Sequence, residues 1–140
     1  MKMHFTREVS AALHYARSKG KFLFSSPENG EEAYLLEPFK VTFRAHSAKQ
    51  PDTICIELNH TPKSMVIYPL DNGLIKLGAI TSTGPQRLHQ ALHRPMQPSQ
   101  FIDLFDDVSV TRVWHGHQQV ETPLPDLIDA LCTAACKTTA

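Results

Sequence analysis

The clearest strand pattern in the sequence is the stretch FKVTFRAH at residues 39–46. Phe39, Val41 and Phe43 occupy alternate positions with polar side chains between them, which predicts a strand with one buried and one wet face. Working outward, the same alternation predicts strands at residues 21–24, 33–37, 53–59, 64–70 and 74–81. The tripeptide DNG at 71–73 is a hairpin signal between the last two. Together these stretches predict an antiparallel meander of five to six strands with one wet face.

Helical spacing replaces this alternation on both sides of the meander. Residues 6–19 carry an apolar stripe at helical spacing, with Thr6 as the N-cap and Gly20 as the stop. Further helices are predicted at 83–94, 99–105 and 124–135, and one more strand at 108–120. We therefore expect a single α+β domain over residues 1–140: an N-terminal helix, an antiparallel meander of five to six strands, two short helices, a further strand, and a C-terminal helix packed on one face of the sheet.

The composition excludes several classes of protein. Lys plus Arg and Asp plus Glu number 14 each in 140 residues, and hydrophobic residues make up 41%. Such a chain is neither disordered nor a coat for nucleic acid, whose binding comes mainly from neutralised phosphates. No apolar run approaches the roughly 18 residues of a membrane span, and the first residues lack a signal peptide. With three cysteines, an odd number, we expect a cytoplasmic protein with reduced thiols and no membrane partner.

Histidine is the one unusually frequent residue type, with eight in the chain. His89 and His93 are four positions apart on a predicted helix, so they share a face. His115 and His117 are two apart on a predicted strand and share a face likewise. Neutral imidazoles are ordinary zinc ligands, which makes these four the candidate metal ligands. No glutamate follows the first histidine, however, so the helical zinc-peptidase motif is incomplete. Surface histidines are the simpler interpretation, and we expect no cofactor, with zinc as the alternative.

Other motifs that carry chemistry are weak or missing from the sequence. No nucleophile elbow or glycine-rich phosphate loop occurs, and Cys55 is best explained as a small, partly buried strand residue. A nucleic-acid surface would use the cations Arg44, Lys63, Lys76, Arg87 and Arg94. Phe39 and Phe43 are predicted on the opposite face from Arg44, so a solvated sheet face is favoured over one that stacks bases.

Five apolar residues do not fit the predicted core face. They are Leu23, Tyr34, Leu36, Tyr68 and Leu74. If they are exposed together, they form a patch that a monomer rarely leaves open, and an open sheet edge invites strand addition or a second copy. The pattern alone leaves core and interface as equal alternatives.

Clear folding signals without a nucleophile, a phosphate loop or an acid–base pair favour a non-catalytic function. We expect a module that binds another protein, as an adaptor, an inhibitor or a chaperone-like protein, and that forms a homo-oligomer through a sheet edge or a helix face. Small bacterial secretion chaperones share its plan of first helix, central sheet and closing helix, as an architectural likeness. The alternatives are a histidine-based metal-dependent hydrolase and a nucleic-acid-binding protein, the latter disfavoured by the neutral charge.

Overall fold

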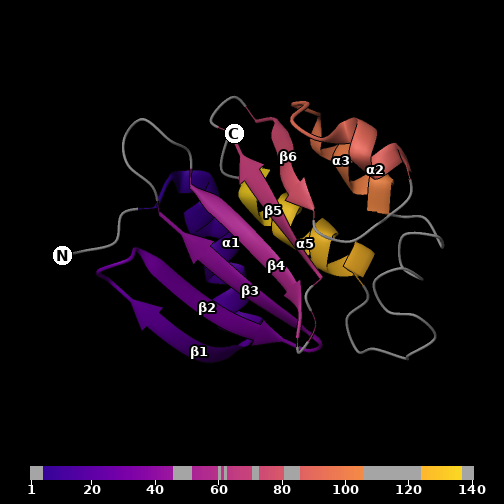
Figure 1. Ribbon diagram of the computed structural model, residues 1–140. Coiled ribbons are helices and arrows are strands. Elements are labelled where there is room, and N and C mark those ends of the chain that lie inside the picture. The colour runs from indigo at the N-terminus through magenta and orange to yellow at the C-terminus, as the bar shows by residue number, and fades with distance from the viewer. Residues whose placement is uncertain are drawn as a thin grey trace.

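Figure 1 shows the computed structural model, which describes residues 5–45, 52–59, 61, 63–70, 73–80, 86–105 and 124–136. In chain order the elements are α1 (Arg7–Lys19), β1 (Lys21–Ser26), β2 (Glu31–Leu36), β3 (Phe39–Arg44), β4 (Thr53–Leu58), β5 (Ser64–Pro69), β6 (Ile75–Ile80), α2 (Gln86–Ala91), α3 (Pro98–Phe105) and α5 (Leu124–Cys136). The predicted α+β class is confirmed, with the N-terminal helix, the meander and the C-terminal helix in their expected order. The strand predicted at 108–120 lies outside the described residues.

The sheet is a meander because every strand pairs with its successor. Its six strands stand in the order β1-β2-β3-β4-β5-β6, and each neighbouring pair is antiparallel. At the centre, Val41 of β3 lies between Tyr34 of β2 and Ile56 of β4. Short connections produce this order, since a chain that turns directly back pairs with the strand it has just left. In the predicted hairpin turn Gly73 takes a φ of +83°, which glycine adopts without strain.

Helices cover one face of the sheet and enclose the core. In Figure 1, α1 and α5 lie behind the strands, and they pack against each other, while α3 packs against α5 and β6. The strands contribute alternate side chains to the core: Phe39, Val41, Phe43, Ile54, Ile56, Met65, Ile67, Ile75 and Leu77. The helices contribute Val9, Ala12, Leu13, Ala16, Leu88, Phe101, Phe105, Leu124, Leu127, Ile128 and Leu131. Removal of this apolar surface from water is the main force that holds the helices on the sheet.

The helix α1 ends where the sequence predicts, but for a different physical reason. Gly20 follows its last turn and donates its N–H to the Ala16 carbonyl at 2.7 Å. The φ of Gly20 is −101°, so no left-handed conformation is involved. A Cβ at this position would lie 2.9 Å from the Ala16 carbonyl oxygen and 3.0 Å from that of Leu35. Glycine therefore serves here to let the helix end approach β2 closely.

A partly buried ion pair also joins α1 to β2. The side chain of Glu32, on the covered face of β2, is only 7% exposed. Arg17 donates from Nε to Glu32 Oε1 at 3.0 Å and from Nη2 to Oε2 at 2.9 Å. The Tyr34 hydroxyl donates to the same carboxylate and accepts from Arg17 Nε at 3.2 Å. These bonds compensate the negative charge of the Glu32 carboxylate, whose burial without partners would be unfavourable. Burial, and then the hydrogen bond to Glu32, raises the pKa of Tyr34.

One predicted helix is shorter at its C-terminal end than expected. The sequence predicts a helix to residue 94, whereas α2 ends at Ala91. His93 takes a φ of +64° and donates its N–H to the Leu77 carbonyl of β6 at 2.8 Å. The helix therefore ends at Ala91 because the backbone of His93 bonds to the edge of β6 instead of continuing the helix. Among the described helices, none is long and apolar enough to span a membrane.

Candidate functional site

The face of the sheet opposite the helices carries a cavity. This face points toward the reader in Figure 1, and no described helix covers it. The cavity, which we call the trough, has a volume of about 390 Å³ and is lined by Phe24, Glu31, Lys40, Thr42, Arg44, Thr53, Cys55, Glu57, Val66 and Tyr68. Its volume lies within the range of small-ligand sites, about 300–1,000 Å³.

The strand register explains the shape of the trough. Ala33, Thr42, Cys55 and Val66 are successive register partners from β2 to β5, so their small side chains form a row across the strands. Longer side chains stand two residues away along each strand, on either side of that row: Leu35, Lys40 and Glu57 on one side, and Glu31, Arg44 and Tyr68 on the other. A row of short side chains between two rows of longer side chains leaves a channel that crosses the sheet.

Charged side chains on the rim of the trough stand beside opposite charges or aromatic rings. Arg44 donates from Nε to Glu31 Oε1 at 3.0 Å, and its Nη2 lies 2.7 Å from the same oxygen. The Nζ of Lys40 lies over the ring of Phe24, 5.4 Å from its centroid, and Glu57 is the register partner of Lys40. The Arg44 side chain remains 50% exposed, and a guanidinium has five N–H donors, so it retains donors for a ligand.

Tyr68 stands at one end of the trough with the edge of its ring toward Gly78. A Cβ on Gly78 would lie 1.8 Å from Tyr68 Cε2, 2.6 Å from Cδ2 and 2.9 Å from Cζ, so the ring edge occupies the space that a larger residue would fill. The Nζ of Lys76, the register partner of Tyr68, lies 5.2 Å from the ring centroid. Glycine at position 78 therefore leaves room for this ring, which we call the aromatic platform.

Two threonine hydroxyls and one thiol line the floor of the trough. Thr42 is 7% exposed and Thr53 5% exposed, and within the described part of the chain neither hydroxyl has a hydrogen-bond partner. Buried hydroxyls of this kind are normally satisfied, so a ligand that bonded them would remove an energetic penalty. Burial, and then the nearby Glu57 carboxylate, raises the pKa of the Cys55 thiol. Cys55 is therefore protonated at neutral pH, and a protonated thiol is a poor nucleophile.

The two edges of the sheet differ. Along β6, Ile75 and Met96 exchange backbone hydrogen bonds of 2.9 and 2.8 Å, and His93 bonds to the carbonyl of Leu77. Among the described residues no segment pairs with the outer edge of β1. Phe22, 58% exposed, and Leu23, 40% exposed, both lie on β1 and are the large apolar side chains left exposed in the described part of the chain.

The predicted interface residues separate into three groups in the structure. Leu23 is exposed on β1. Tyr34 and Leu36 are each 6% exposed and belong to the core, because the register of β2 turns Glu32, Tyr34 and Leu36 together toward the helices. Of the two alternatives that the sequence pattern leaves open, these two residues take the core. Tyr68 and Leu74 are half-buried, and Tyr68 lies on the uncovered face.

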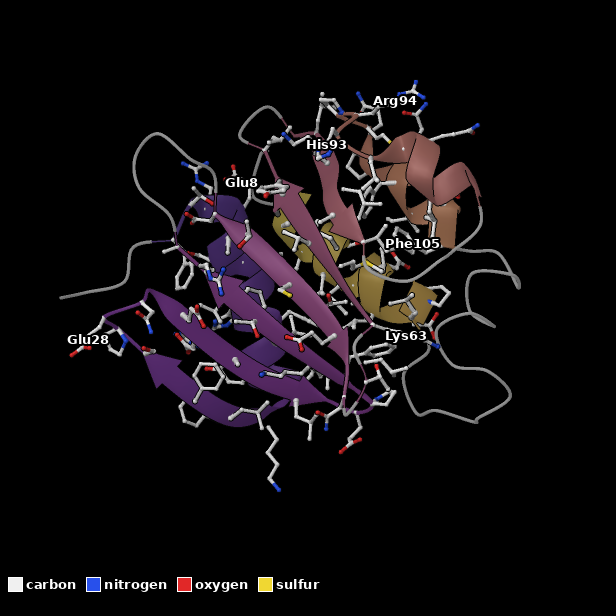
Figure 2. All side chains as sticks on the ribbon, in the orientation of Figure 1. Glu8, Glu28, Lys63, His93, Arg94 and Phe105 are labelled. Atoms are coloured by element: carbon white, nitrogen blue, oxygen red, sulfur yellow. The ribbon has the colours of Figure 1, made fainter. Side chains whose placement is uncertain are left out.

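The predicted nucleic-acid cations do not form one patch. Arg44 and Lys76 stand in register positions on the uncovered face of the sheet. Figure 2 shows Lys63 and Arg94 at well-separated ends of the molecule. The side chain of Arg87 lies outside the described residues.

The predicted metal ligands do not share the helical face on which the prediction depended. His93 lies beyond the last residue of α2 and is exposed (Figure 2). The side chain of His89, and both His115 and His117, lie outside the described residues. Within the described residues, no group of three or more His, Cys, Asp or Glu side chains is placed to hold a metal ion.

Sequence reasoning did not identify the trough or the platform. Alternation along β3 and β4 predicts that Thr42 and Cys55 are on the wet face, but that signal does not reveal which residues become neighbours across strands. Phe24 and Tyr68 come from strands far apart in the sequence, and only the register brings their rings to one face with Lys40 and Lys76.

Comparison of the chain with protein-family models, with curated proteins and with solved structures gives no match.

Proposed function

We propose that this protein is a non-catalytic protein-binding module, of the adaptor, inhibitor or chaperone-like kind, and that it self-associates through the edge strand β1. The occupant of that edge is a second copy of the same chain. Its β1 pairs antiparallel with the first, so that the sheet continues from one subunit into the next.

The contrast between the two sheet edges carries this proposal. An edge strand presents a row of N–H and C=O groups that other chains can bind, and proteins commonly cover such edges or place charges on them. The residues after α2 cover β6 through the backbone bonds of His93 and Met96. β1 combines an edge that no described residue covers with the exposed Phe22 and Leu23. Apolar side chains beside an open edge are a feature of strand addition.

The sequence of β1 is compatible with pairing to its own copy. Lys21 and Ser26 are at opposite ends of the strand, so antiparallel pairing about a two-fold axis places Lys21 near Ser26 of the partner subunit and away from a second lysine. Phe22 is the register partner of Tyr34, which faces the helices, and its ring makes an edge contact with Tyr34 at 5.7 Å between centroids. In this register Phe22 stands opposite Ser25 of the partner subunit, on the same face of the continued sheet.

The molar mass in solution tests the proposal. We expect light scattering after gel filtration to give twice 15.7 kDa for the natural chain. The variant Leu23→Lys removes an exposed apolar side chain and adds a charge of the kind that protects natural edge strands. We expect it to remain folded and to give a mass of 15.7 kDa.

Ser99→Lys is the matched control, because Ser99 is an exposed residue of α3, beyond the covered β6 edge. It should leave the mass of the natural chain unchanged. A natural chain that is monomeric at every concentration would overturn the proposal, as would a dimer that Leu23→Lys leaves intact.

The two alternatives stay predictions with their own tests. A histidine-based metal-dependent hydrolase requires His89, His93, His115 and His117 to converge, and near-stoichiometric metal in protein purified without a histidine tag would support it. Nucleic-acid binding requires an affinity that falls steeply with salt.

A further inference from the structure

The ring of Tyr68 stands on the uncovered face of the sheet, at one end of the trough. Tyr68 lies beside Gly78, whose lack of a Cβ leaves room for the ring, as the 1.8 Å distance from a Cβ on Gly78 to Tyr68 Cε2 indicates. Tyr68 is half-buried and lines the trough. An aromatic ring at the edge of a polar cavity is suited to stack on another planar ring.

Cations stand on either side of this platform in the same row. Arg44 and Thr53 are register partners, as are Tyr68 and Lys76, and continuing the β4–β5 register by one residue makes Thr53 the neighbour of Tyr68. Because neighbouring strands are about 4.8 Å apart, Arg44 and Tyr68 are separated by about 10 Å along this row. A ring stacked on Tyr68 can thus carry an anionic group to Arg44 across a short polar linker above Thr53.

Hydroxyl groups occupy the floor where that linker would lie. Thr42 and Thr53 are at least nine-tenths buried, line the trough, and in the described part of the chain have no hydrogen-bond partner for their hydroxyls. Each hydroxyl can donate one hydrogen bond and accept others, which matches a ligand rich in hydroxyl and ether oxygens. In the lining of the trough, Lys40 and Arg44 balance Glu31 and Glu57, and Lys76, which lies over the Tyr68 ring, adds one cation beside it.

We propose that the trough binds a nucleoside monophosphate, with its base stacked on Tyr68, its ribose over Thr53 and its phosphate at Arg44. The volume of about 390 Å³ accommodates a ligand of this size. Self-association adds a strand beside β1, whereas Arg44, Thr53 and Tyr68 lie on β3, β4 and β5, so the proposed ligand contacts are separate from the proposed self-association.

Titration calorimetry on the full chain tests this site with four probes. Adenosine 5′-monophosphate contains the base and the phosphate, adenosine contains only the base, and ribose 5-phosphate contains only the phosphate. The fourth probe is a short oligothymidylate strand. We expect the monophosphate to bind at least tenfold more tightly than adenosine or ribose 5-phosphate, and we expect added salt to weaken its binding.

Three variants assign the binding to the platform and to Arg44. Tyr68→Leu should weaken monophosphate binding by about 5-fold to 150-fold, the range for loss of one stacked base. Gly78→Ala keeps the tyrosine but displaces its ring, and it should weaken binding similarly. Arg44→Gln should reduce the affinity for the monophosphate at least fivefold while leaving the affinity for adenosine unchanged. Arg94→Gln is the matched control, because Arg94 is exposed and well separated from the face (Figure 2).

Several results would overturn the proposal. Undetectable binding of the monophosphate to the natural chain at millimolar concentration would do so, and this result does not depend on any variant. Equal binding of ribose 5-phosphate would reduce the trough to an anion site, and binding of oligothymidylate alone would assign the face to single-stranded nucleic acid. A monophosphate affinity that Tyr68→Leu, Gly78→Ala and Arg44→Gln all leave unchanged would place the ligand elsewhere on the protein.

Discussion

Replacement of Arg17 by methionine tests how the helix α1 is held on the sheet. Methionine matches the apolar stem of arginine but lacks the guanidinium. The substitution deletes the bonds of 3.0 and 2.9 Å to Glu32 and the bond of 3.2 Å to the Tyr34 oxygen. Glu32, whose side chain is 7% exposed, then keeps the Tyr34 hydroxyl as its remaining side-chain donor.

The expected loss of stability follows from the burial of the two partners. Removing one member of a fully buried ion pair costs about 3–5 kcal/mol, because the other charge stays buried and unpaired. The Arg17 side chain is 51% exposed, so water can take over part of its role at the rim of the pair. We therefore expect Arg17→Met to reduce the free energy of unfolding by about 1–3 kcal/mol.

Urea unfolding, followed by circular dichroism, measures this change. Lys19→Met is the control, because Lys19 is an exposed basic residue in the same last turn and should change stability by about 0.5 kcal/mol or less. The double variant Arg17→Met, Glu32→Gln replaces the unpaired carboxylate by a neutral amide. It should be at least about 1 kcal/mol more stable than the sum of the single changes implies. The reasoning fails if Arg17→Met costs no more than Lys19→Met, or if the two single changes are additive.

Two further predictions concern titratable groups. Folding raises the pKa of Tyr34, so as the pH rises the unfolded chain loses its phenolic proton first, and stability should fall above the ordinary tyrosine value of 10.0. Urea unfolding measures the free energy of unfolding at about pH 8 and about pH 11. The decrease between these two pH values should be smaller for Tyr34→Phe than for the natural chain. An equal decrease would contradict a raised pKa of Tyr34 in the folded protein. Burial raises the pKa of Cys55, so its alkylation by iodoacetamide, taken as the difference from Cys55→Ser, should increase with pH to a midpoint above that of free cysteine. A midpoint at or below that of free cysteine would contradict this environment.

The sequence predicts the meander because its information is local. The alternation around Phe39, Val41 and Phe43 fixes which face of β3 is buried, and short turns leave each strand beside the next. The same local rule fails at β2, where Glu32 lies on the covered face beside Tyr34 and Leu36. A carboxylate is tolerated there because Arg17 reaches it from α1, and that partner is 15 residues away in the chain.

The candidate sites depend on register, which the sequence pattern does not specify. The platform of Tyr68 requires Gly78 beside the ring, and an irregularity in the β5–β6 pairing next to Val66 shifts the partners of this region. The shortened α2 has a similar cause, because hydrogen bonding of His93 to the β6 edge outweighs the helical pattern of the sequence. The sequence does not show which edge strand other residues cover, so the contrast between β1 and β6 is known only from the structure.

Amide hydrogen exchange along β1 tests self-association most directly, because outward N–H groups of an edge strand are protected only when another strand bonds them. In concentrated samples of the natural chain, we expect the outward-facing amides of residues 21–26 to exchange slowly. On dilution into the monomer range these amides should exchange faster, while the β1 amides that bond to β2 and the amides of the central strand β3 remain protected. In Leu23→Lys the outward-facing β1 amides should exchange quickly at every concentration. Fast exchange along β1 in the concentrated natural chain, or protection that neither dilution nor Leu23→Lys changes, would contradict the proposal that this edge joins two copies.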